Sequence, residues 1–166
     1  MTRSSIRAAT PDDADAICAI YNHYVSNTAI SFEEEPVSSG EMARRLADIT
    51  AANLPWLVLC EDDLVAGYAY ATKWRVRQAY RFSVETSIYL GQHHTGKGSG
   101  RMLYEALLAE LRRRELHLAI AGIAQPNEAS VRLHEALGFR KVAHFSEVGR
   151  KFGNWIDVGY WQLQLN

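Results

Sequence analysis

The chain has 166 residues, 48% of them hydrophobic, so it is long enough for one core and too short for two, and we expect a single domain over residues 1–166. Its 18 basic and 19 acidic residues give a net charge of -1, which argues against nucleic acid or an anionic membrane as a partner. No apolar run approaches a membrane span and the opening "MTRSSIRAATPDD" has no apolar segment typical of a signal peptide, so we expect a cytoplasmic protein with a small-molecule partner and with Cys18 and Cys60 reduced.

The N-terminal half predicts a strand, two helices and two further strands in chain order. Their expected ranges are 5–9, 10–25, 41–49, 55–61 and 64–73. In the first helix, apolar residues from Ile17 onward recur at the i, i+3, i+4 and i+7 spacing of one buried face. Asp62 and Asp63 separate the last two strands and are typical of a hairpin turn.

The C-terminal half begins with a strand at 81–90 that places Glu85, Ser87 and Tyr89 on the face opposite Val84 and Thr86. A glycine-rich loop leads directly into an amphipathic helix at 99–114. The remaining elements are a strand, a helix closed by Gly138 and two strands, at 117–124, 127–138, 139–148 and 155–165. This order mixes hairpins with one strand-helix-strand unit and does not indicate a doubly wound parallel sheet.

The loop "GQHHTGKG" and the glycine that follows the next serine suggest a phosphate site. Glycines let successive backbone N–H groups turn toward one concavity, and a helix N-terminus adds partial positive charge. A plain flexible connection would need fewer glycines. An ATP loop would need Ser or Thr where Gly98 stands, and a dinucleotide loop would need Gly where Arg101 stands. Spacing alone does not identify the ligand.

"HHTGKGSG", between "SIYL" and an amphipathic helix, resembles the pyrophosphate loop of the GNAT acetyltransferase superfamily, with His93 in place of the usual Gln or Arg. The resemblance implies an α+β fold, with a mixed, mostly antiparallel twisted sheet of about seven strands and about four helices. It also implies acetyl-CoA as cosubstrate, with no metal. The cofactor-binding residues that it implies are Ile88, Tyr89, Leu90, His93, Gly96, Lys97, Gly98, Ser99, Gly100, Arg101, Asn127 and Ser130.

"YRFSVETSIYL", "SVRLHEALGF" and "VGRKFGNWIDVGYWQLQL" extend the resemblance to the phosphinothricin N-acetyltransferase branch. This branch acetylates the α-amino group of phosphinothricin, methionine sulfone or methionine sulfoximine. Glu85 matches the glutamate that acts as base there, although taken alone it would be an ordinary strand carboxylate. His134 lies where many relatives have a proton-donating Tyr, and it could be an acid, a second base or a buried structural histidine.

The segment before Glu85 is rich in arginine and aromatic residues, which suit a carboxylate or phosphinate ligand. An exposed, charged hairpin tip is the alternative interpretation. The expected substrate-binding residues are Phe32, Trp74, Arg75, Arg77 and Tyr80.

Two other functions are compatible with the sequence. A GNAT enzyme for a polyamine or a protein N-terminus is one alternative, and a non-catalytic acyl-CoA-binding module is another. The histidine and cysteine spacings give no metal motif, and no nucleophile elbow of a serine hydrolase occurs. The aromatic C-terminal strand and the family resemblance predict a homodimer, and direct transfer in a ternary complex is expected over a covalent acyl-enzyme.

Overall fold

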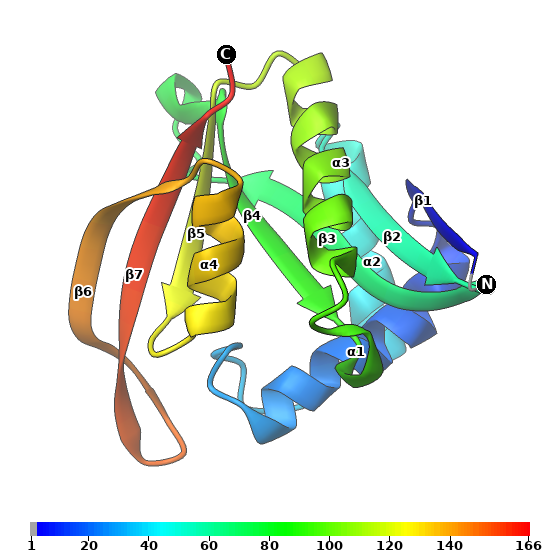
Figure 1. Ribbon diagram of the computed structural model, residues 1–166, viewed down its shortest axis with the longest axis horizontal. Coiled ribbons are helices and arrows are strands. Elements are labelled where there is room, and N and C mark those ends of the chain that lie inside the picture. The colour runs from blue at the N-terminus through cyan, green and yellow to red at the C-terminus, as the bar shows by residue number, and fades with distance from the viewer. Residues whose placement is uncertain (1–2) are drawn as a thin grey trace.

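Seven strands form one mixed sheet in the order β1-β2-β3-β4-β5-β7-β6 in the computed structural model, which describes residues 3–166 (Figure 1). Neighbouring strands are antiparallel except for β4 and β5, which are parallel. The strands are β1 (Ser4–Ala8), β2 (Trp56–Glu61), β3 (Leu64–Lys73), β4 (Ser83–Leu90), β5 (Leu118–Ala124), β6 (Arg140–Lys151) and β7 (Asn154–Gln164). The mixed, mostly antiparallel sheet predicted from the sequence is confirmed.

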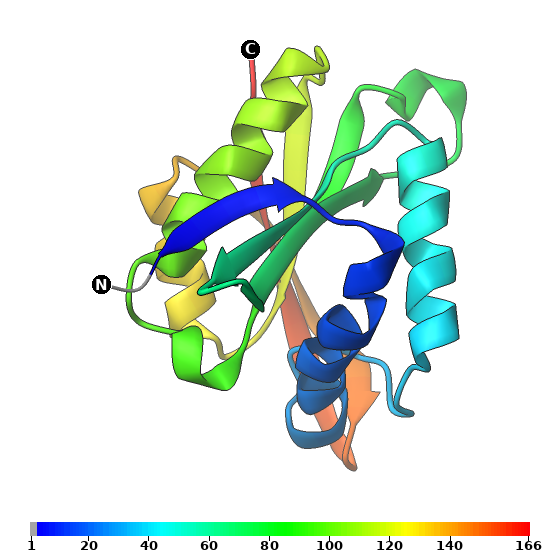
Figure 2. The ribbon, with the colours of Figure 1, turned by 90° about the vertical axis from the view of Figure 1, so that its right-hand side faces the viewer.

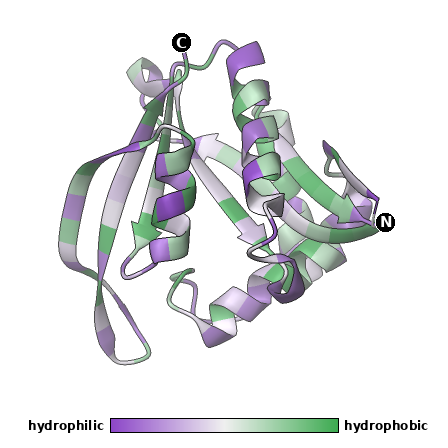
Figure 3. Ribbon diagram, viewed as in Figure 1, coloured by the Kyte–Doolittle hydropathy of each residue, from purple (hydrophilic) through white to green (hydrophobic). Residues whose placement is uncertain are grey.

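Four α-helices cover the two faces of the sheet (Figure 2). They are α1 (Ala14–Asn27), α2 (Ser39–Ala51), α3 (Ser99–Arg113) and α4 (Glu128–Ala136). The apolar stripe of α3 is buried on one face, with α4 packed against the same core, while α1 and α2 bury a second core on the other face. Figure 3 shows apolar colouring along the central strands and polar colouring on the outer sides of α3 and α4. Burial of these stripes is the main source of helix stability.

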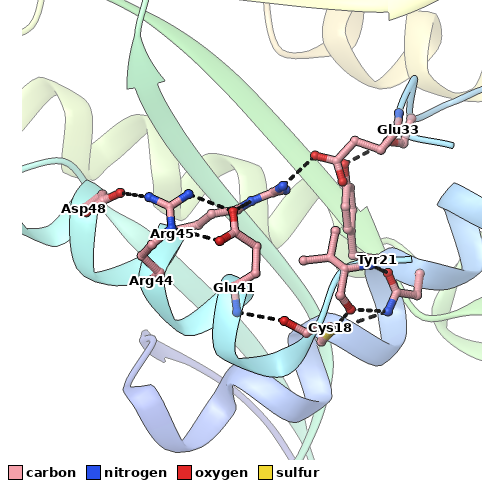
Figure 4. Close-up of polar contacts among 11 residues, drawn as sticks. Cys18, Tyr21, Glu33, Glu41, Arg44, Arg45 and Asp48 are labelled. Carbon is pink, nitrogen blue, oxygen red and sulfur yellow. Dashed lines mark hydrogen bonds and ion pairs between the residues drawn. The ribbon is translucent and has the colours of Figure 1, made fainter. Parts of the chain in front are cut away.

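Polar contacts hold the segment between α1 and α2 in place (Figure 4). The Arg45 guanidinium lies 2.7 Å from a Glu33 carboxylate oxygen and 3.0 Å from Glu41. The Cys18 thiol donates to the Val37 carbonyl at 2.9 Å, so this buried cysteine fixes the same segment from the α1 side. Cys18 and Cys60 are both free and buried.

Several boundaries differ from the sequence prediction, among them the start of α1, which is at Ala14 rather than at residue 10, and two of the differences have a clear cause in the structure. Helix α2 begins at Ser39 rather than at Glu41, because the Ser38 hydroxyl accepts the Glu41 N–H at 3.1 Å and caps the first turn. Strand β6 continues to Lys151 rather than ending at 148, and Phe152 and Gly153 then form the turn with φ of 51° and 77°. Lys151 at the end of β6 is held by carbonyl groups of the N-terminal region, which keeps this part of the strand in place. Because these partners are distant in sequence, the local pattern did not predict the extension.

The turn predicted at Asp62 and Asp63 is confirmed, with both residues at positive φ, and Gly138 ends α4 at φ 95°. Within residues 3–166, every helix is too short or too polar to cross a membrane.

Candidate active site

Strands β4 and β5 separate after only three paired residues. Ser83–Glu85 pairs with Leu118–Ile120, and beyond this point the two strands diverge (Figure 1). A narrow cavity of about 60 Å³ lies in the resulting wedge, and Thr86 stands at its apex. The backbone of β4 beyond the apex is therefore free to pair with an extended ligand in place of β5.

Glu85 is the last β4 residue paired with β5, and its side chain is half-buried on the sheet face that α1 and α2 partly cover. Burial raises the pKa of the Glu85 carboxyl above its ordinary value, and the positive charge of Arg75 opposes this shift. Glu85 itself lines neither the wedge cavity nor the second cavity described below, but a half-buried carboxylate with a raised pKa at the point where the strands part is suited to accepting a proton.

A second cavity of about 250 Å³ lies over β5, β7 and β6, next to the Glu85 region. Trp74, Arg75 and Tyr160 are among its lining residues. The Arg75 guanidinium lies 4.0 Å over the Trp74 ring and donates to the Trp74 carbonyl at 3.0 Å. Among residues 3–166, no carboxylate lies within ion-pair distance of Arg75, so its charge is available for an acidic ligand.

Arg77 and Tyr80 do not line this cavity. Both are exposed, and Tyr80 belongs to the short 3₁₀ turn Gln78–Tyr80. Of the predicted substrate-binding residues, Trp74 and Arg75 line this cavity. Tyr160, which the sequence did not suggest, completes it because the β5–β7 register places Gly122 opposite Tyr160. A Cβ on Gly122 would lie 3.0 Å from the Tyr160 ring, so glycine allows this close packing.

The glycine loop has the backbone geometry expected of an anion site. Gly96 and Gly98 adopt φ of 75° and 84°, and Gly98 is the N-cap residue of α3. Neither glycine has a neighbouring atom within 4 Å of an ideal Cβ, so conformation rather than crowding favours glycine here. His93 and Lys97 are exposed on this loop.

Two hydrogen-bonding partners inside the protein hold the ends of the glycine loop. The Glu61 carboxylate accepts from His94 Nδ1 at 2.7 Å and from the Ser99 hydroxyl at 3.3 Å. The Gln92 amide lies 2.9 Å from Nε2 of His23 on α1. Because the Ser99 side chain is already bound to Glu61, its backbone N–H is the group left for a ligand.

Other predicted cofactor residues fall into two groups. Ile88 and Tyr89 line the wedge, and the Leu90 carbonyl accepts a hydrogen bond from the Tyr24 hydroxyl at 2.5 Å. Gly100 is buried in the first turn of α3, while Arg101 is exposed and forms an ion pair with Glu105 at 2.8 Å.

Helix α4 brings three predicted residues to the other side of the wedge, where Asn127, Ser130 and His134 all line the cavity. The Asn127 side-chain oxygen accepts the Ser130 N–H at 3.2 Å and caps α4, which leaves its amide N–H₂ for a ligand. His134 is only 3% exposed, and burial lowers the pKa of its imidazole.

The loop after α1 closes the open end of the wedge. Ile30 from this loop lines the cavity, and the Phe32 ring packs so closely on β6 that a Cβ on Gly149 would clash with it. Lys151 binds the same region, because its Nζ donates to the carbonyls of Val25 at 2.7 Å and Ser31 at 2.6 Å. Phe32, predicted as a substrate-binding residue, lines neither cavity, and the sequence gave no signal for Lys151.

Replacing Lys151 by Met is expected to destabilise the fold by about 3 kcal/mol, since two buried carbonyls would lose a charged donor. The change should lower the thermal melting midpoint and increase hydrogen exchange in residues 25–32. Lys141→Met is the control, because Lys141 is exposed, with the His144 side chain as hydrogen-bond partner and its ammonium 5.2 Å from the Trp161 ring, and so holds no buried carbonyl. Equal melting midpoints for the two variants would contradict this role of Lys151.

In residues 3–166, no three His, Cys, Asp or Glu side chains gather in a way that could hold a metal ion. The site is instead a wedge with a glycine loop at one end, a half-buried carboxylate at its apex and a free arginine beyond it. Such a site suits proton removal from a ligand held between the two strands.

Comparison with known families matches residues 6–159 to the acetyltransferase (GNAT) domain. Among characterised proteins, the chain is 42% identical to an L-methionine sulfoximine/L-methionine sulfone acetyltransferase of Salmonella typhimurium, covering 98% of this chain and 95% of the relative. It is 40% identical to a phosphinothricin N-acetyltransferase of Streptomyces viridochromogenes, covering 95% and 85% respectively.

The fold is similarly matched by solved structures. A GNAT superfamily phosphinothricin acetyltransferase from Sinorhizobium meliloti, crystallised in complex with acetyl-CoA, superimposes with a TM-score of 0.95 at 37% identity. That match covers 98% of this chain and 89% of the other.

Proposed function

Because the chain belongs to the GNAT acetyltransferase family, we propose that it transfers acetyl from acetyl-CoA to the α-amino group of a small amino acid. Phosphinothricin, methionine sulfone and methionine sulfoximine are the expected acceptors, as the names of the relatives suggest. The observation that carries this proposal is the position of Glu85, half-buried at the apex of the β4–β5 wedge with the unpaired Arg75 nearby.

Acetyl-CoA would bind along the wedge. The N–H groups around Gly96, Gly98 and Ser99 at the start of α3 would hold the pyrophosphate without a metal ion. The pantetheine arm would pair with the free backbone of Ile88 and its neighbours, opposite the Asn127 amide. This placement puts the thioester near the apex, where β4 leaves β5.

Glu85 would accept the first proton of the substrate ammonium, directly or through water, so that the amine can attack the thioester carbon. Its raised pKa makes it a better proton acceptor than an exposed carboxylate. Attack by the amine within one complex of both substrates needs no protein nucleophile, and both cysteines lie buried away from the wedge, on α1 and β2.

The acceptor amino acid would occupy the cavity over β5 and β7. Arg75 would bind its α-carboxylate through paired donors, with Trp74 and Tyr160 as apolar walls. Phe32 does not line this cavity, but it packs on Gly149 of β6 and would flank the acceptor from the loop after α1. We leave Arg77 and Tyr80 out of this pocket because neither lines the cavity.

We also propose that the protein is a single-domain homodimer of the cytoplasm. Strand β6 is an edge strand, and Phe145, Val148, Phe152 and Trp155 on the β6–β7 hairpin are exposed apolar residues that a second copy could cover.

The test is a thiol-release assay with acetyl-CoA and a panel of free amino acids, polyamines and peptides. We expect release with phosphinothricin, methionine sulfone and methionine sulfoximine at far lower KM than with polyamines. Preference for a polyamine or for a peptide N-terminus would replace the proposed substrate class. Tight acetyl-CoA binding with no thiol release from any amine would indicate a non-catalytic module.

A further inference from the structure

A buried chain of hydrogen bonds leads away from the apex of the wedge. The Thr86 hydroxyl lies 2.5 Å from the Tyr104 hydroxyl, which lies 2.9 Å from Nε2 of His134. These side chains come from β4, α3 and α4, and each is at least 96% buried. The chain therefore joins the sheet to both helices on this face, beneath the cavity that Thr86 and His134 line.

His134, at the end of this hydrogen-bond chain that lies farthest from the wedge, determines which group donates in each hydrogen bond. His134 Nδ1 lies 2.7 Å from the Ser130 carbonyl, which can only accept, so Nδ1 carries a hydrogen. In a neutral imidazole Nε2 then accepts, and the Tyr104 hydroxyl must donate to it. The Tyr104 oxygen in turn accepts from Thr86, whose alternative acceptor, the Ile120 carbonyl, is farther away at 3.4 Å.

The surroundings keep both inner groups neutral. Phe139 packs against the rings of Tyr104 and His134, and no carboxylate among the described residues contacts either one. Burial lowers the pKa of His134 and raises the pKa of Tyr104. Tyr104 is the titratable side chain that faces His134 from α3, and β4 and α4 add only hydroxyl and backbone partners.

Because the Thr86 hydroxyl donates to Tyr104, its oxygen keeps a free lone pair at the cavity end of this hydrogen-bond chain. The hydrogen-bond chain can therefore accept a proton from the cavity, but in the resting protein it has no hydrogen directed toward the cavity. We propose that Thr86, Tyr104 and His134 form a proton relay that takes one proton from the attacking nitrogen and returns it to the departing sulfur of CoA. This inference rests on the proposed acetyl transfer, and it assigns the relay separately from Glu85.

The two proton transfers balance. After Glu85 has taken the first proton of the ammonium, the amine forms its bond to the carbonyl carbon and becomes positively charged. Its second proton passes to Thr86, the Thr86 proton passes to Tyr104, and the Tyr104 proton passes to His134 Nε2. When the carbon–sulfur bond breaks, the same three steps run backwards and protonate the thiolate. The products are the amide and neutral CoA thiol, with the relay restored.

The position of Thr86 supports this role. It is the first β4 residue beyond the last β4–β5 pair, Glu85 with Ile120, so its hydroxyl stands where the two strands part. Glu85 and Thr86 point to opposite faces of the sheet, which lets one residue serve the incoming ammonium while the next serves the reacting nitrogen and sulfur.

The test compares kcat in the thiol-release assay for Thr86→Val, Thr86→Ser, Tyr104→Phe and the double variant Thr86→Val/Tyr104→Phe. Val and Phe each remove one hydroxyl, and we expect either change to lower kcat by about a hundred-fold. Thr86→Ser should restore most of the activity. The double variant should be no slower than the slower single variant, because one break already stops the relay.

If these hydrogen bonds only supported the structure, Thr86→Val would keep the wild-type kcat, or the reductions in kcat of Thr86→Val and Tyr104→Phe would multiply in the double variant. Either result overturns the relay. The KM for acetyl-CoA should stay near its wild-type value throughout, and kcat is measured well below the melting midpoint of each variant, because the loss of a buried hydroxyl also lowers stability. NMR of the His134 ring nitrogens provides a readout independent of turnover, and hydrogen on Nε2 instead of Nδ1 in the resting protein would also overturn it. An inactive wild-type protein would count against acetyl transfer itself.

Discussion

Replacing Glu85 by Gln is expected to lower kcat by a factor of about 10² to 10⁴, the usual contribution of a positioned general base, without weakening acetyl-CoA binding. Gln keeps the size of the side chain and its hydrogen-bonding oxygen but cannot accept the proton of the ammonium. The measurement is thiol release at saturating acetyl-CoA with the best amino acid from the panel. Glu35→Gln, at an exposed position of the loop between α1 and α2, is the matched control.

The pH dependence has a defined sign. Glu85 works as the carboxylate, so kcat/KM should rise with pH through the pKa of Glu85, which burial holds above its ordinary value. The Gln variant should lose this rise. Because a raised pKa in the folded state means that ionised Glu85 costs stability above that pKa, the Gln variant should melt no lower than wild type. Unchanged kcat in Glu85→Gln would show that another group removes the proton.

Replacing Arg75 by Ala is expected to raise the KM for the amino acid by about 10- to 100-fold, the loss of a hydrogen-bonded charge pair, with little change in the KM for acetyl-CoA. Arg75→Lys should recover only part of the loss, because an ammonium cannot bind a carboxylate through two parallel donors. The measurement is steady-state kinetics with each substrate varied in turn.

Arg81→Ala is the control for Arg75, since Arg81 is exposed and its guanidinium lies over the Phe82 ring at 4.5 Å rather than in the cavity. An equal rise in both KM values for Arg75→Ala would argue against a substrate-binding role. A substrate amide in place of the α-carboxylate should show the same high KM with the wild-type enzyme and with the Ala variant.

The sequence was sufficient where a function depends on neighbouring residues. The glycine loop, the amphipathic helix after it and the place of Glu85 on the strand before it all follow from local spacing and family resemblance, and the structure has the predicted elements in the predicted order. Gly96 and Gly98 have the positive φ values that such a loop requires.

Residues that depend on long-range packing could not be found in this way. Tyr160 reaches the substrate cavity only through the pairing of β5 with β7, which no local pattern fixes. Tyr104 lies on the apolar stripe of α3, where a tyrosine is indistinguishable from ordinary core until α4 supplies His134 as its partner. The only feature of the sequence that could have drawn attention to Tyr104 is a hydroxyl-bearing residue among the buried leucines of this stripe.

The Lys151 contacts also constrain the order of folding. They join residues 126 and 120 positions apart along the chain, so the loop that closes the wedge gains its anchor only after the β6–β7 hairpin has been synthesised. Contacts of such high sequence separation form late because loop closure must precede them. A nascent chain would thus hold its glycine loop and Glu85 before the loop after α1 is anchored, and this side of the active site would become complete only once β6 has been synthesised.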